Sequence, residues 1–135
     1  MAKTNESKLY NLIKTNLKNV HFMRIESYTE QGIPDVNACY NGKELWLELK
    51  CNTAKNLGLS KYQIVWIMRR VKHGGVVWIA NRPPRQRATF FYSGSLVRGS
   101  GISANEQPTF VVSPNDLTWD AAKEILWPRT SVKLV

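Results

Sequence analysis

The sequence predicts an α/β fold in which helices cover the apolar faces of one sheet. The pair Asn41-Gly42 separates two runs of alternating polarity, which is the strongest short-range signal for a β-hairpin. A helical pattern of apolar residues follows from Ser60, and a short apolar run at 76–80 indicates a buried strand. Strand, hairpin, helix and strand in this order are typical of a sheet packed against helices.

The length of 135 residues and the hydrophobic content of 43% suit one domain with a buried core. We divide it into a core at about 5–80 and a C-terminal extension at 81–135. The N-terminus is polar and no run of about 18 apolar residues occurs, so we expect a cytoplasmic protein without a membrane partner. Cys39 and Cys51 fall on opposite faces of the predicted hairpin, which favours free thiols, and no Cys-x-x-Cys or paired histidines indicate zinc.

The chain before the hairpin is predicted to form a helix and then a strand. The helix covers about 5–17, because four apolar side chains recur there at helical spacing and Thr4, Asn5 or Ser7 could cap its start. The strand covers about 20–28, although its alternation of apolar and polar residues is imperfect.

The hairpin register follows from counting outward from the turn. Tyr40 pairs with Lys43, and Asp35 then lies opposite Glu48. Since strand side chains alternate between faces, Lys50 projects from the same face as Glu48. Facing carboxylates repel, and a hard divalent cation, which prefers oxygen ligands, would offset that repulsion. The opposite face is an almost wholly apolar core surface, formed by Val36, Ala38, Tyr40, Leu45, Leu47 and Leu49.

The second helix begins with a capping box and ends at a glycine pair. Ser60 and Gln63 have the spacing in which the Gln side chain reaches back to the cap amide. The pair Gly74-Gly75 stops this helix. Beyond the strand at 76–80, we predict strands near 88–92 and 109–112, a mobile Gly- and Ser-rich segment at 93–108, and a helix from about Thr118 to Trp127.

Charge is distributed unevenly along the chain, which has a formal net charge of +9. Between Glu48 and Glu106 there are ten Lys or Arg residues and no Asp or Glu. Such a stretch beside a carboxylate pair suggests a polyanionic substrate led to a cation-binding centre, and a solubilising surface is the alternative. The residues predicted to bind DNA are Lys61, Arg69, Arg70, Lys72, Arg82, Arg85 and Arg87.

Two short motifs resemble a nuclease signature. Pro34-Asp35, followed after twelve residues by Glu48-Leu49-Lys50, resembles the PD-(D/E)XK nuclease superfamily. The wider pattern adds Gly32-Ile33, Leu59 to Gln63 and a glycine pair before an apolar strand, and it resembles the VRR-NUC branch, which is related to Holliday junction resolvases. The resemblance covers about residues 6–80.

The resemblance implies a restriction-endonuclease-like mixed sheet, with an α-β-β-β-α-β core flanked by helices and a C-terminal strand and helix extension. It implies a metal-dependent endonuclease that uses Mg²⁺ and also accepts Mn²⁺. Asp35, Glu48 and the Leu49 carbonyl would hold the metal, and Lys50 would position water or stabilise the transition state.

Two further site residues rest on the resemblance and have structural alternatives. Gln63 would hold a water or a phosphate, or it would only cap its helix. Glu6 matches an acidic residue that the family carries on its first helix, but a carboxylate in a first helical turn also suits the helix dipole. Glu26, on the strand beside the hairpin, is the rival of Glu6 for completing the metal site.

The resemblance further implies branched DNA, such as a four-way junction, as substrate. No base-reading motif is visible, and two symmetric cuts suggest a homodimer. From size and resemblance we expect a phage-encoded recombination enzyme that acts in the host cytoplasm. The alternatives are a restriction-like or nicking endonuclease on duplex DNA, and a basic nucleic-acid-binding module without catalysis.

Overall fold

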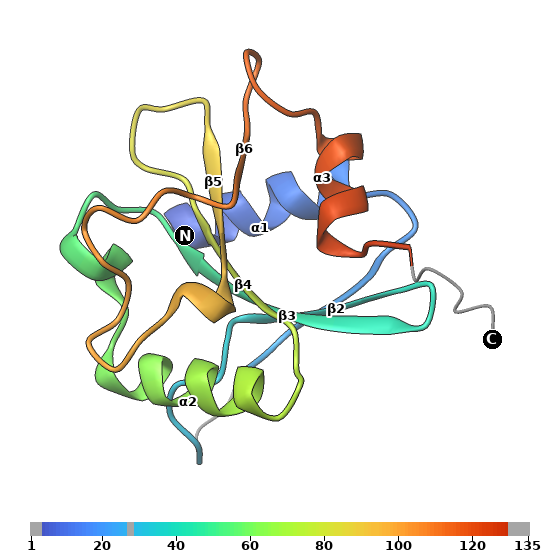
Figure 1. Ribbon diagram of the computed structural model, residues 1–135. Helices are drawn as coiled ribbons and strands as arrows, with labels where there is room; N and C mark the ends of the chain where they lie inside the picture. Colours follow the sequence, from blue (N-terminus) through green and yellow to red (C-terminus); the bar gives the residue numbers. More distant parts are fainter. Residues whose placement is uncertain (1–3, 27–28, 130–135) are drawn as a thin grey trace, which may run out of the picture.

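The computed structural model describes residues 4–26 and 29–129 and contains one six-stranded mixed sheet with helices on both faces (Figure 1). The strands follow chain order across the sheet, and only β3 and β4 run parallel. Within these ranges, no helix is long and apolar enough to cross a membrane. The elements are α1 (Asn5–Asn16), β1 (His21–Arg24), β2 (Val36–Tyr40), β3 (Lys43–Lys50), η1 (Lys55–Gly58), α2 (Lys61–Lys72), β4 (Val77–Asn81), β5 (Thr89–Ser93), η2 (Gly94–Leu96), β6 (Phe110–Val112) and α3 (Trp119–Leu126).

The β2–β3 hairpin has the predicted register. Tyr40 pairs with Lys43, and the ladder continues outward to Val36 opposite Leu47. Asn41 and Gly42 have φ values of 56° and 80°, as a turn with two left-handed residues requires. Asp35 and Glu48 lie one residue beyond this last ladder pair, and the Asp35 carboxylate is close enough to raise the pKa of Glu48. The predicted core surface is buried on the opposite face, with Tyr40 half-buried at its margin.

One face of the sheet is covered by α1 and α3 (Figure 1). Thr4 caps α1 by accepting a hydrogen bond from the Ser7 amide, so the first of the three predicted caps is the one used. Leu9 and Ile13 of α1 pack into the same cluster as the apolar face of the hairpin and Leu126 of α3. The C-terminal extension therefore completes the core under the nuclease-like segment, and β5 and β6 continue its sheet.

The other face is covered by α2, which connects the parallel strands β3 and β4 (Figure 1). Ser60 and Gln63 form the predicted capping box at its start. Ile64 and Ile67 point inward and pack against Ile79 of β4 in a second apolar cluster. Because this helix starts beside the end of β3, its first turn lies next to Glu48 and Lys50.

Two expectations about irregular segments need correction. The first strand covers only His21–Arg24 of the predicted 20–28, and residues 27 and 28 lie outside the described residues. Of the segment at 93–108, predicted to be mobile, the parts around Gly94, Val97 and Ile102 are buried, whereas residues 103–107 are exposed as predicted for a surface loop. Gly94 is buried, and Val97 and Ile102 contribute to the apolar cluster under α2, which composition rich in Gly and Ser had hidden.

Candidate active site

Asp35 follows a tight turn that packs closely against the start of α2. Gly32 of this turn has φ +88°, and a Cβ atom there would lie 2.3 Å from the carbonyl oxygen of Tyr62. Only glycine allows that approach. Pro34 is fully buried, and Asp35 Oδ2 accepts a hydrogen bond from the Leu49 amide at 2.9 Å. The turn thereby fixes the Asp35 carboxylate over the end of β3.

Glu48 is a buried acid in an arrangement that opposes its ionisation. Glu48 is 2% exposed, and its Oε2 accepts a hydrogen bond from Gln63 Nε2 at 2.9 Å. Burial chiefly, and then the neighbouring Asp35 charge, raise the pKa of Glu48 to about 8, against the opposing effect of Lys50. Among the described residues, no group donates a hydrogen bond to Glu48 Oε1, although this atom is buried.

Lys50 is held on the same face by three oxygen atoms. Its Nζ donates to the Gly58 carbonyl at 3.2 Å and to Gln63 Oε1 at 3.1 Å. It also lies 3.5 Å from Glu48 Oε2. The side chain is 15% exposed, so its charge is largely shielded from water and lies against the Glu48 carboxylate. Asp35, Glu48 and Lys50 thus come together as the hairpin register predicts.

Gln63 belongs both to the helix cap and to the site. Its side-chain Oε1 accepts a hydrogen bond from the Ser60 backbone amide at 2.8 Å, and the Gln63 backbone amide donates to Ser60 Oγ at 3.1 Å. The same Oε1 accepts from Lys50, while Nε2 donates to Glu48. Gln63 therefore caps α2 and contacts two site residues at once, with Oε1 shared between the cap and Lys50, and its predicted role in holding a water or a phosphate stays a prediction.

The acids proposed to complete the site are not gathered with the carboxylate pair. Among residues 4–26 and 29–129, no group of three or more His, Cys, Asp or Glu side chains is placed to hold a metal. Glu6 is exposed in the first turn of α1 and lies near Cys51, where burial and then the Glu6 charge raise the pKa of the thiol. Glu26 is exposed beyond the end of β1. The choice between these two acids stays a prediction.

The oxygen atoms that are present suit a hard divalent cation. Glu48 Oε1 is a buried carboxylate oxygen without a donor among the described residues, and the Asp35 carboxyl is close enough for its charge to raise the pKa of Glu48. Carboxylate oxygens are the ligands that Mg²⁺ and Mn²⁺ prefer. The Leu49 amide donates to Asp35 Oδ2 and thereby orients a carboxylate that could serve as such a ligand.

The predicted DNA-binding cations divide into two groups. Arg82, Arg85 and Arg87 follow β4, and the Arg82 amide donates to the Lys50 carbonyl, so this loop lies at the end of the sheet where the site is. Lys61, in the first turn of α2, also lies at this end. Arg69, Arg70 and Lys72 belong to the last turns of α2, about 12–17 Å further along the helix axis than Lys61.

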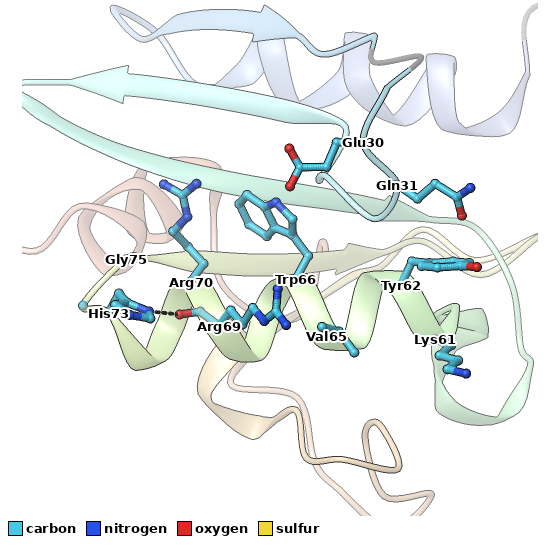
Figure 2. A pocket seen from close by; sticks show the side chains of 11 residues that line it. Glu30, Gln31, Lys61, Tyr62, Val65, Trp66, Arg69, Arg70, His73 and Gly75 are labelled. Carbon is cyan, nitrogen blue, oxygen red and sulfur yellow. Dashed lines mark hydrogen bonds between the residues drawn. The ribbon is translucent and has the colours of Figure 1, made fainter.

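A groove of about 790 Å³ lies along α2, between this helix and the turn that carries Glu30 and Gln31 (Figure 2). Arg70 lies over the rings of Trp46 and Trp66, with its guanidinium carbon 5.3 Å and 4.6 Å from the two centroids. The groove combines cations with partly exposed aromatic and apolar side chains, whereas the site at the end of the hairpin is built around the carboxylates of Asp35 and Glu48. Its lining residues are Glu30, Gln31, Lys61, Tyr62, Val65, Trp66, Arg69, Arg70, His73, Gly74 and Gly75.

Three asparagines that the sequence analysis did not single out hold the loop between β3 and α2, next to the site. Asn81, 4% exposed, exchanges hydrogen bonds with the Asn52 backbone at 3.1 Å and 3.0 Å. Asn52 and Asn56 in turn bond the loop that leads from β3 to α2. A buried polar residue at the end of an apolar strand was the available signal for Asn81.

Comparison with known proteins identifies the fold. The chain is similar to the 1.6 Å resolution structure of Archaeoglobus fulgidus Hjc, a Holliday junction resolvase from an archaeal hyperthermophile. The TM-score is 0.51 and the sequence identity 17%, over 88% of this chain and 93% of that chain. No protein-family model and no curated protein sequence matches the chain. The mixed sheet and its flanking helices thus have the restriction-endonuclease-like fold that the two short motifs predict.

Proposed function

We propose that this protein is a metal-dependent, structure-selective endonuclease that hydrolyses phosphodiester bonds in branched DNA. One observation carries the proposal: Asp35, Glu48 and Lys50 meet at the end of a hairpin, with a buried Glu48 oxygen left without a donor among the described residues. A protein that only binds DNA gains nothing from facing carboxylates, since these repel phosphate. The similar fold of an archaeal Holliday junction resolvase supports the same reaction class.

The residues of the cluster have separate roles in this reaction. Asp35 and Glu48 would hold Mg²⁺ or Mn²⁺, and the Leu49 carbonyl and Glu6 or Glu26 stay candidates to complete the shell. When bound, the metal ion would supply an activated water and neutralise charge on phosphoryl oxygens. Lys50, aimed at the carboxylates, would position the attacking water and stabilise negative charge that develops on the phosphate. Gln63 would fix both Glu48 and Lys50 from the start of α2.

The cations near the site fit a phosphate backbone better than base edges. Lys61 and the Arg82, Arg85 and Arg87 loop lie at the same end of the sheet as the carboxylates. Contacts of this kind supply affinity without reading sequence, so the shape of the DNA would select the substrate. The narrower assignment to the VRR-NUC branch, and a phage origin, stay predictions.

We further propose that the enzyme acts as a homodimer through α2, since resolving a junction requires two symmetric cuts. Tyr62, Val65 and Met68 of this helix are 55%, 44% and 38% exposed, and Val76 just beyond it is 45% exposed. Two of these side chains, Tyr62 and Val65, also line the groove of Figure 2. A second copy of the chain, packing helix against helix, would cover them.

A cleavage panel tests the substrate class. Wild-type protein is incubated with a four-way junction, a flapped duplex and a linear duplex of matched sequence, each with Mg²⁺, Mn²⁺ or EDTA. We expect cleavage of the junction with either metal and none in EDTA, with Lys50→Ala as an inactive control.

The same panel, extended by a linear plasmid whose products are run on a denaturing gel, separates the alternatives. Discrete fragments from a linear plasmid, with no preference for the junction, would identify a restriction-like or nicking enzyme and would refute shape selection. Binding of all three DNAs without metal-dependent cleavage of any would leave a nucleic-acid-binding module, and the proposed reaction would be wrong.

A further inference from the structure

The loop between β3 and α2 holds an unusual backbone conformation directly behind Lys50. Asn56, Leu57 and Gly58 are three consecutive left-handed residues, with φ values of 59°, 52° and 70°. Residues other than glycine rarely adopt this left-handed backbone region, and leucine does so more rarely than asparagine. Such a conformation persists only where surrounding contacts impose it.

One set of those contacts comes from the end of the active-site strand. Asn52 Nδ2 donates to the Leu57 carbonyl at 3.2 Å, and Asn52 itself is anchored to the buried Asn81. A Cβ atom on Gly58 would lie 2.9 Å from Asn52 Nδ2, so loop and asparagine are in close contact.

The second set comes from the C-terminal extension. Asn56 Oδ1 accepts a hydrogen bond from the Ile102 amide at 2.6 Å. A Cβ atom on Gly101 would lie 1.8 Å from the same oxygen, so no side chain fits there without moving Asn56. Ile102 is anchored in turn, because it is 6% exposed and packs with Val97 in the cluster under α2.

The held loop ends in an acceptor for the site. The Gly58 carbonyl, the last of the three left-handed residues, receives a hydrogen bond from Lys50 Nζ. We propose that Asn56 is a positioning residue for Lys50: through its bond to the Ile102 amide, the C-terminal segment fixes the Gly58 carbonyl and thereby the lysine ammonium. The expected effect on DNA cleavage rests on the proposed function, whereas the expected effect on the position of Lys50 does not.

Three substitutions at Asn56 separate the hydrogen bond from the backbone conformation. Asn56→Asp keeps an acceptor oxygen for Ile102 and tolerates a left-handed backbone. Asn56→Gly keeps the backbone and removes the acceptor, and Asn56→Ala removes both. Asn105→Ala, an exposed position in the same part of the extension, is the matched control. Thermal unfolding verifies that each variant is folded.

The first measurement is the rate of reductive methylation of each lysine by formaldehyde and borohydride, read by peptide mass spectrometry. A released Lys50 should react about threefold or more faster in Asn56→Gly and Asn56→Ala than in wild type, since its amine loses one of its fixed acceptors. The exposed Lys61 should not change, and Asn56→Asp should react at the wild-type rate. This readout does not require nuclease activity, so it stands even if the wild type cuts no DNA.

The second measurement is the cleavage of a four-way junction. Misplacing Lys50 should lower kcat by about tenfold while KM stays within about twofold, because a positioning loss acts on the reaction step. Asn56→Asp should restore kcat. Unchanged Lys50 methylation and kcat in a folded Asn56→Gly protein would overturn the proposal, because the acceptor oxygen would then be dispensable. Failure of Asn56→Asp to restore either quantity would overturn it as well.

Discussion

At the scale of single residues, Gln63 serves the fold and the site with one amide group. Sequence reasoning could place it at the third position of a helix, where it caps Ser60, or in a nuclease site. The structure shows that Oε1 accepts hydrogen bonds from the Ser60 amide and from Lys50 Nζ while Nε2 donates to Glu48, and a catalytic role of Gln63 stays a prediction. Replacing Gln63 should therefore lower activity more than replacing Ser60, its partner in the capping box.

Ser60→Ala and Gln63→Ala each remove half of the capping box. Ser60→Ala should lower the free energy of unfolding by about 1 kcal/mol and leave cleavage within about threefold of wild type. Gln63→Ala should cost about 1–3 kcal/mol and at least about tenfold in kcat, because Glu48 and Lys50 lose a partner. Chemical denaturation and single-turnover cleavage check the two effects. Equal losses of activity would show that Gln63 only caps α2.

Glu48 should make the stability of the metal-free protein depend on pH. Its pKa is raised from 4.5 to about 8 in the folded state, so the folded state retains the proton that the unfolded state releases. Stability contributed by the neutral carboxyl is complete below 4.5 and is lost as pH rises toward about 8. Glu48→Gln should therefore unfold at a progressively higher temperature than wild type across this window, and the difference should level off above it.

Thermal unfolding in EDTA from pH 4 to pH 9 measures this difference, with pH steps of about 0.5 to resolve the titration. Glu44→Gln, an exposed acid on the same strand, is the control and should show no such trend. A constant difference between Glu48→Gln and wild type across the range would contradict the burial of an ionisable Glu48.

At the scale of elements, the hairpin could be predicted because its information is local. An Asn-Gly turn and a side-chain period of two fix the register, and the register alone places Asp35 beside Glu48. The approach of the Gly32 turn to α2 could not be found this way, since it depends on tertiary packing against the Tyr62 carbonyl. The packed segment at 94–102 was missed for the same reason, because its order comes from burial of Val97 and Ile102.

Gly32 and Gly42 offer a matched test of the contact between the turn and α2. Both have left-handed φ values, 88° and 80°, but a Cβ atom at Gly42 meets nothing within 4 Å. Alanine should cost about 1 kcal/mol of strain at either position. Gly32→Ala should add about 1–3 kcal/mol of overpacking and displace Asp35, so it should also lose cleavage. Denaturation and cleavage assays compare the two variants, and equal behaviour would contradict the close approach.

At the scale of the whole molecule, the C-terminal extension is part of the same sheet and the same core. β5 and β6 continue the sheet, and Leu126 of α3 packs with the apolar face of the hairpin. Motifs cover about residues 6–80, so they predicted the nuclease-like half and left the role of the extension open. Sequence charge located a cationic stretch, but the fold divides it between the site and the far end of α2.

The proposed dimer predicts a difference between two exposed apolar positions. Val65 on α2 is 44% exposed and Ile125 on α3 is 36% exposed, on opposite faces of the sheet. Val65→Glu should shift the protein toward monomer by at least about tenfold in dissociation constant, because it places charge in an apolar contact. Ile125→Glu should not. Sedimentation velocity measures both, and an unaltered Val65→Glu dimer or a wild-type monomer would contradict an interface on α2.

The proposed function assigns metal-dependent cleavage to the facing carboxylates at the end of the hairpin. The most direct measurement compares wild type and Asp35→Asn on a four-way junction under single-turnover conditions, with junction binding measured in parallel. We predict Mg²⁺-dependent cleavage by wild type and a loss of at least about 100-fold in Asp35→Asn, with junction affinity retained. Cleavage by Asp35→Asn at the wild-type rate, or equal wild-type cleavage in EDTA, would contradict the claim.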